Sequence, residues 1–265
     1  MGDGGLFVDV VGVGASSERA RWLLDHVGRA GLGEAGVLLM GVWWVWVFTS
    51  WVTNWGDPHM TPVRLLLFAM MLAGLVLSTS IPEAFGERGL FFAAAYVFMQ
   101  VGRCAFMLWA LRSHNAGNFR NFQRITAWLA VSGVFWILGG LLHGEARIAL
   151  WIIAIAIEYL SPSTGFWTPG LGRSAPSEWD VEGAHMAERC GLFIIIALGE
   201  SVLVTGATFS ELTWTASEIA AFVAAFVGSV AMWWIYFNIG AERASHFIAS
   251  ASDPGRQARL AYTYI

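Results

Sequence analysis

The sequence contains no lysine and few charged residues of either sign. All 15 basic residues are arginines, and only 13% of the 265 residues are charged. A soluble domain carries about a quarter charged residues, so this chain has too few to cover a surface that faces water. The absence of lysine also excludes Schiff-base chemistry and lysine-containing phosphate loops.

Cysteine, histidine clusters and basic patches are also scarce. Two cysteines, Cys104 and Cys190, are too few for a disulfide framework. The net charge of −4 offers no basic surface for a nucleic acid. The six histidines are scattered, and no nucleophile stands beside one at helical spacing. We therefore expect no enzyme activity, no catalytic residues, no metal site and no cofactor.

Hydrophobic residues are abundant, at 57% of the chain with a mean hydropathy of +0.59. A helix needs about 20 apolar residues to cross a bilayer. Seven stretches meet or nearly meet this length, and together they hold only seven of the 34 charged residues. The seven stretches are Ala35–Asn54, Val63–Ile81, Gly89–Leu111, Ile125–Leu142, Ala146–Leu160, Arg189–Ala207 and Ala216–Ile239. These seven spans predict an all-α polytopic membrane bundle over residues 35–265, whose main partner is the lipid bilayer.

The first 34 residues are ambiguous. Leu6–Leu24 is apolar enough to suggest an eighth helix, but Glu18, Arg19 and Arg21 lie in its second half. No cationic segment precedes it, so it is not a secretory signal peptide. We predict a weak or interfacial helix followed by a loop over residues 1–34.

The arginines outside the apolar cores are unevenly divided between the two ends of the spans. One end holds nine of them and the other five, or two when the three N-terminal arginines are set aside. Cytoplasmic loops are enriched in arginine and lysine, so the loop over residues 112–124 is predicted to be cytoplasmic. The Pro- and Gly-containing stretch from Ser161 to Glu182 is predicted to be an extramembrane loop.

We expect three of the seven charged residues in the spans to lie within the membrane: Arg103, Glu158 and Glu200. Such residues mark functional sites by default and are expected to have partners. With a rise of 1.5 Å per residue, Arg103 lies about 12 Å and Glu200 about 16 Å from the same end. Their similar depth and opposite charge predict an ion pair. Glu158 is the competing partner, because an arginine side chain can extend toward it.

Other polar residues extend this pattern. Tyr96, Gln100 and Arg103 are spaced four and three residues apart, which places them on one helix face. Ser201 follows Glu200, and His185, Glu188 and Arg189 cluster at the cytoplasmic mouth of the same span. One interpretation is a polar pathway of a transporter or channel-like protein for an unknown small solute or ion. The alternative is a structural or regulatory membrane protein whose buried charges only fix helix packing. Under either interpretation, a second copy of the chain in a homo-oligomer is an expected partner.

Several motifs follow one another along the chain, and they are Trp43-Trp44, Trp51–Trp55, Ile81–Gly86, Gln100–Arg103, Ala156–Tyr159, His185–Phe193 and Ala197–Ser201. On these motifs, and from Trp22 onward, the chain resembles the bacterial low-temperature-requirement A (LtrA) family of multi-pass membrane proteins. The resemblance implies a transporter- or channel-like architecture in the bacterial inner membrane, without an established substrate. Family members continue beyond Ile265, so we expect the chain to be truncated at its C-terminus.

Overall fold

The computed structural model describes residues 29–53, 60–112, 116–174 and 183–240, with only the backbone described for 29–30, 52–53, 183–187 and 240. These ranges contain no strand, only one isolated bridge between Thr168 and Gly172. Seven helical stretches are long and apolar enough to cross a membrane, which confirms the predicted all-α bundle of seven spans. The helix predicted near the N-terminus lies outside the described residues.

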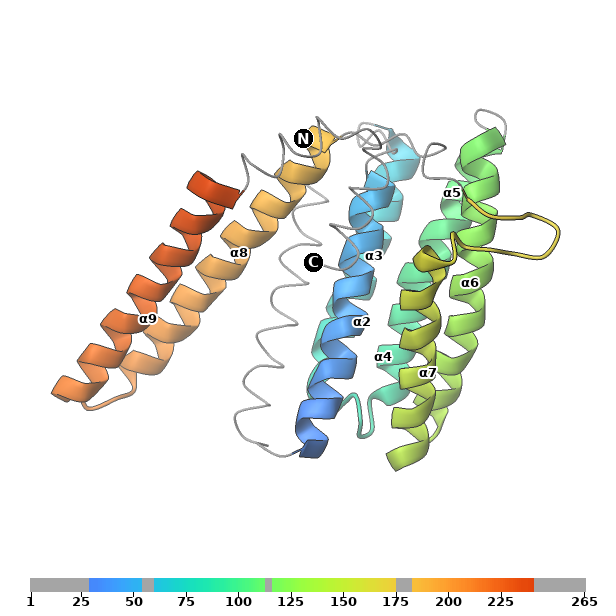
Figure 1. Ribbon diagram of the computed structural model, residues 1–265. Helices are drawn as coiled ribbons and strands as arrows, with labels where there is room; N and C mark the ends of the chain where they lie inside the picture. Colours follow the sequence, from blue (N-terminus) through green and yellow to red (C-terminus); the bar gives the residue numbers. More distant parts are fainter. Residues whose placement is uncertain (1–28, 54–59, 113–115, 175–182, 241–265) are drawn as a thin grey trace.

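The spans run alternately up and down (Figure 1). The third span is made of two α-helices with a π-helical turn, η2, between them, and α3 ends in a short 3-10 turn, η1. The elements are α2 (Arg29–Thr53), α3 (Thr61–Ser80), η1 (Ile81–Glu83), α4 (Gly89–Val97), η2 (Phe98–Gly102), α5 (Arg103–Leu111), α6 (Ala116–Leu141), α7 (Gly144–Ser163), α8 (Gly183–Ser210), α9 (Ala216–Ile235) and the π-helical η4 (Tyr236–Gly240).

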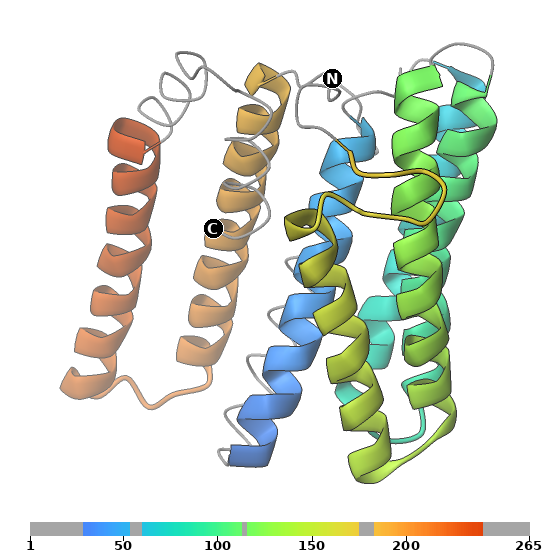
Figure 2. The same ribbon diagram turned by 45° about the vertical axis from the view of Figure 1, so that its right-hand side comes forward.

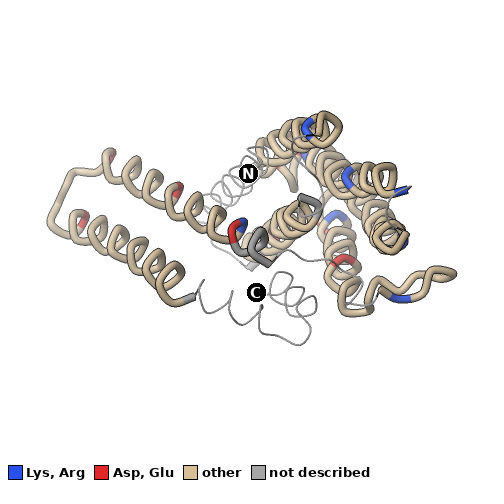
Figure 3. The backbone as a smooth tube through the Cα atoms, turned by 90° about the horizontal axis from the view of Figure 1, so that it is seen from above, with Lys and Arg blue, Asp and Glu red and all other residues tan. Residues whose placement is uncertain are grey.

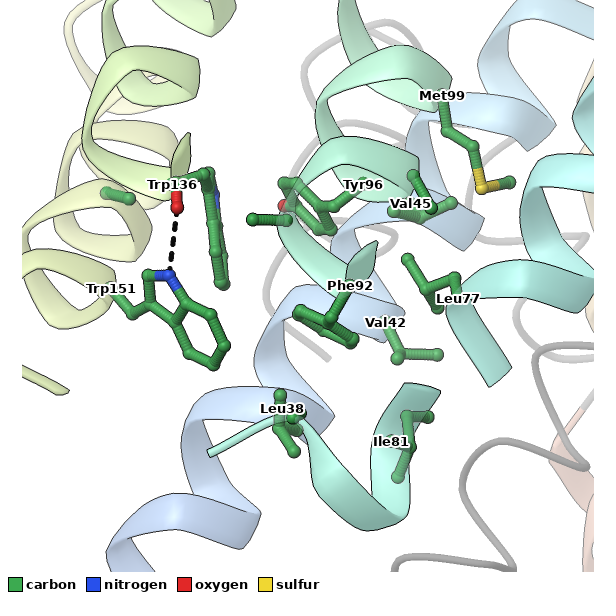
Figure 4. Close-up of a cluster of buried hydrophobic side chains, with 14 of the residues drawn as sticks. Leu38, Val42, Val45, Leu77, Ile81, Phe92, Tyr96, Met99, Trp136 and Trp151 are labelled. Atoms are coloured by element: carbon green, nitrogen blue, oxygen red, sulfur yellow. Dashed lines mark hydrogen bonds between the residues drawn. The ribbon is translucent and has the colours of Figure 1, made fainter. Parts of the chain in front are cut away.

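Helices α2 to α7 form one bundle in which large aromatic side chains fill the centre. Trp136 on α6 and Trp151 on α7 are completely buried, with ring centroids 5.2 Å apart, and Phe92 on α4 packs against both (Figure 4). The Trp151 indole donates a 3.0 Å hydrogen bond to the Trp136 carbonyl. Lipid provides no hydrophobic force between helices, so close packing and such hydrogen bonds hold the bundle together.

Helices α8 and α9 form a hairpin that stands beside the bundle (Figures 2 and 3). No residue of α9 is buried, and neither is any in the most apolar part of α8. The start of α8 contacts α2 through Phe193, whose ring centroid lies 4.9 Å from that of Trp46. The hairpin therefore exposes most of its apolar surface.

The predicted loop over residues 112–124 is mostly helix. Helix α6 begins at Ala116, and Asn121 and Arg124 are buried on its first turns. A hydropathy pattern detects only the apolar part of a span, whereas the helix continues beyond it. Similarly, α2 begins at Arg29, six residues before the predicted first span. The cytoplasmic location of this end of the bundle stays a prediction.

The described part of the predicted loop after α7 folds over α6. Arg124 donates to the Leu171 carbonyl from both Nε and Nη2, at 3.1 and 2.6 Å. The Trp128 indole donates to the Trp167 carbonyl at 3.0 Å. These hydrogen bonds join the loop to the buried Arg124 side chain and to Trp128 on α6.

Arg147 joins two turns at the opposite end of the bundle. It is 1% exposed, and its guanidinium donates to the carbonyls of Ala84 and Gly86 between α3 and α4. It also donates to the carbonyls of Gly139, Gly140 and Leu142 at the end of α6. Backbone carbonyls left unpaired at helix ends are thereby satisfied without exposure to lipid.

Close helix contact predicts the effect of one glycine substitution. A Cβ at Gly140 would lie 3.0 Å from the Ala93 Cβ and 3.1 Å from the Leu90 Cα, so Gly140→Ala must push α6 away from α4. We expect it to lower the free energy of unfolding by about 1–3 kcal/mol, measured as a lower thermal midpoint in detergent.

The matched control is Gly206→Ala on α8, where a Cβ would meet nothing within 4 Å. We expect this variant to be unchanged or more stable, since alanine favours a helix over glycine by about 1 kcal/mol. Equal midpoints for the two variants would contradict the described α4–α6 contact.

Candidate functional site

A buried carboxyl group lies at the centre of the bundle. Glu158 on α7 is 1% exposed and accepts hydrogen bonds on both oxygens. The Tyr96 hydroxyl from α4 donates to Oε2. The Ser132 hydroxyl and the Trp136 indole, both from α6, donate to Oε1, the indole at 3.1 Å. Three helices thus converge on one carboxyl group.

The hydrogen bonds continue from Glu158 to a buried arginine. The Gln100 side-chain amide donates to the Tyr96 hydroxyl at 3.3 Å, and its oxygen accepts from Nη2 of Arg103. Nη1 of Arg103 donates to Oγ1 of Thr49 on α2 at 2.7 Å. We call this set, from Glu158 and its donors to Arg103 and Thr49, the polar network. The opposite charges at its two ends are linked through neutral side chains.

The π-helical turn η2 lies in the middle of this network. Gln100 belongs to η2, and Arg103 is the first residue of α5 directly after it. A π-helical turn inserts an extra residue into an α-helix, and such turns are common at functional sites. Gln100 and Arg103 are both 1% exposed, and both point into the bundle.

Four of the predicted site residues meet in the polar network: Tyr96, Gln100, Arg103 and Glu158. The predicted Arg103–Glu200 ion pair is wrong. The Arg103 guanidinium bonds to α2 and η2 instead, and Glu200 lies on α8, which leaves the bundle. The expected depth of a residue along its helix says nothing about which helices are neighbours. The hydrogen bonds connect Arg103 to Glu158 instead, through the side chains of Gln100 and Tyr96.

The remaining predicted residues lie away from the polar network. Glu200 is half-buried on α8 and Ser201 is exposed beside it. At the start of α8, Glu188 is exposed and Arg189 is buried, while the side chain of His185 lies outside the described residues. A role for this cluster as a cytoplasmic mouth stays a prediction.

Sequence reasoning missed Thr49, Ser132 and Trp136. Ser132 and Trp136 are four residues apart and share a face of α6, which was a signal of the same kind as the Tyr96–Gln100 spacing. Serine and threonine are harder to interpret, because their hydroxyls can bond to the carbonyl one turn earlier. Thr49 does so at 2.7 Å to Val45, and it also accepts from Arg103.

The chemistry available in the polar network is proton exchange and charge compensation. Glu158 is the only carboxyl group among the buried side chains of the described residues. No group of three or more histidine, cysteine or acidic residues in the described part of the chain could hold a metal ion. The polar network can hold a proton on Glu158 and relay a change in its charge toward Arg103.

The fold and the polar network together define a polytopic α-helical membrane protein with charges buried inside its bundle. The chain belongs to the bacterial low temperature requirement A (LtrA) family, whose model matches residues 5–265. It is similar to an uncharacterized protein of Rhizobium meliloti (strain 1021), with 42% identity over 260 residues. That match covers 98% of this chain but 63% of the relative, less than two thirds of its length. No solved structure matches the chain.

The hydrogen bond from Tyr96 to Glu158 predicts that replacing Tyr96 with phenylalanine destabilises the protein more than the same replacement at Tyr159. Tyr96→Phe removes a donor from a buried carboxyl group, so we expect a loss of about 1–3 kcal/mol in the free energy of unfolding. Chemical denaturation in mixed detergent micelles measures it.

Tyr159→Phe is the control, because the Tyr159 hydroxyl donates to a neutral backbone carbonyl, that of Met40, at 3.1 Å in an exposed place. We expect it to cost less than half as much. A larger loss for Tyr159→Phe would be inconsistent with the polar network as the centre of the bundle.

Proposed function

We propose that this chain forms a transporter or channel-like unit of the bacterial inner membrane, in which Glu158 takes up and releases a proton. The observation that supports this proposal is the burial of Glu158 and Arg103 on separate helices within the bundle. Placing a charge at the bilayer centre costs about 2.5–3.5 kcal/mol on insertion scales. Charged groups buried at such a cost commonly serve conduction or proton relay.

The hydrogen-bond partners of Glu158 suit a group that changes its protonation state. Tyr96 and Ser132 bond to it through hydroxyl groups, which can donate or accept. They can therefore donate to the carboxylate and also adjust when one carboxyl oxygen carries the proton. The Trp136 indole can only donate, which favours keeping the proton on the other oxygen, Oε2.

A structural or regulatory role is the second candidate. The polar network ties α2, α4, α6 and α7 together, and both oxygens of Glu158 are satisfied. A buried polar set of this kind can fix which helix faces meet. In that case its removal would lower stability without changing any flux.

The same proposal gives the molecule an orientation. The end of the bundle where α6 begins carries Arg112, Arg120 and Arg124, and the positive-inside rule places such an end in the cytoplasm. In this orientation the segment after α7 that folds over α6, residues 164–174, would lie on the cytoplasmic side.

Proton flux into proteoliposomes tests the role of Glu158. The protein is reconstituted with chloride and phosphate on both sides, the outside is made acidic while valinomycin and equal potassium hold the membrane potential at zero, and a pH-sensitive dye inside the vesicles reports proton entry. We expect Glu158→Gln to reduce flux at least about tenfold, because an amide keeps the size of the side chain but cannot exchange a proton.

Glu145→Gln is the matched control, since it makes the same chemical change at an exposed position in the first turn of α7. We expect it to retain the wild-type flux. Unchanged flux in folded Glu158→Gln would refute the proposal. A wild-type protein with no flux, together with a lower thermal midpoint for Glu158→Gln, would favour the structural role.

A further inference from the structure

Two buried hydrogen-bond donors next to the polar network have no acceptor among the described residues. They are Nε of Arg103 and Nε1 of Trp44, on side chains that are 1% and 0% exposed. Both side chains border Phe48, whose ring centroid lies 5.7 Å from Cζ of Arg103 and 5.2 Å from the Trp44 ring. Buried donors without acceptors are rare in proteins and call for an explanation.

Among the described residues, Arg103 also has no carboxylate as a direct partner. Its hydrogen bonds go to the Thr49 hydroxyl, the Gln100 side-chain oxygen and the Val45 carbonyl, which are all neutral, and the Cys104 thiol lies beside it. Glu158 is reached only through Gln100 and Tyr96. A guanidinium whose Nε–H remains available can bind a compact anion with good geometry.

We propose that Arg103 and Trp44 bind a small monovalent anion beside Phe48, and that this anion binds together with a proton on Glu158. The inference rests on the proposed function, because it requires Glu158 to exchange a proton. With Glu158 ionised, the charges of Arg103 and Glu158 cancel. When Glu158 takes up a proton, one positive charge is left in the bundle, and an anion at Arg103 neutralises it. The substrate class is a compact monoanion such as a halide or a short carboxylate.

The surroundings of Glu158 make it the group that couples the proton to the anion. The titratable groups that interact with it are Tyr96 from α4 and Arg103 from α5, and Cys104 and Tyr159 lie beside Arg103 and Tyr96 respectively. The polar side chains that α2 and α6 bring to the polar network, those of Thr49, Ser132 and Trp136, are neutral. Glu158 is the only carboxyl group in this set.

Anion titrations of the purified protein in detergent test the inference. Sodium chloride and sodium acetate replace sodium gluconate at constant ionic strength, and tryptophan fluorescence and proton uptake are recorded. We expect saturable binding whose Kd falls by up to about tenfold for each unit of decrease in pH, with one proton taken up per anion. Arg103→Gln should abolish it, and Trp44→Phe should weaken it. Arg112→Gln, at an exposed position just after α5, should not change it.

Glu158→Gln keeps the test decisive if Arg103→Gln fails to fold. Its neutral amide imitates the protonated carboxyl group, so we expect tight anion binding that no longer depends on pH, although its proton flux is lost. Loss of proton flux without saturable anion binding to the wild type would overturn the anion site and leave the proposed function standing. Binding that is independent of pH in the wild type would overturn the coupling. A water molecule as the acceptor would give no saturation with either anion, which also overturns the site.

Discussion

Polar groups inside a bilayer cannot be solvated by water, and the rest of this structure depends on that constraint. A buried donor, acceptor or charge in the bundle therefore needs a partner in the protein or in a bound ligand. Arginine meets this demand well, because its five N–H groups can satisfy several acceptors at once. Arg147 does so at one end of the bundle with backbone carbonyls alone, and Arg124 does so in part at the other.

Arg103 differs from these two arginines in where it lies and in what it is linked to. Arg124 and Arg147 bond to carbonyls of turns and loops, where they hold the ends of helices together. Arg103 lies within a span, beside a π-helical turn, and its hydrogen bonds lead to a buried carboxyl group. The same physical demand therefore produces two kinds of arginine site, and only the one at Arg103 combines a buried charge with a group that can exchange a proton.

The sequence predicted which residues share a helix face, but not which helices are neighbours. The spacing of Tyr96, Gln100 and Arg103 correctly predicted one polar helix face, because residues three and four apart lie on the same side of a helix. The pairing of Arg103 with Glu200 failed, because equal depth does not make two helices neighbours. Helix α8 leaves the bundle after its first turns, and nothing in its local sequence distinguishes a helix that diverges from one that packs.

Composition and hydropathy were enough to predict the membrane class, the seven spans apart from their exact ends, and the all-α fold. Those properties depend on the length and polarity of each segment, which are local. Only the tertiary structure decided that Glu158 rather than Glu200 is linked to Arg103, and that Thr49, Ser132 and Trp136 complete the polar network. The partners of a buried polar group depend on how helices rotate and cross, and packing between distant segments sets those angles.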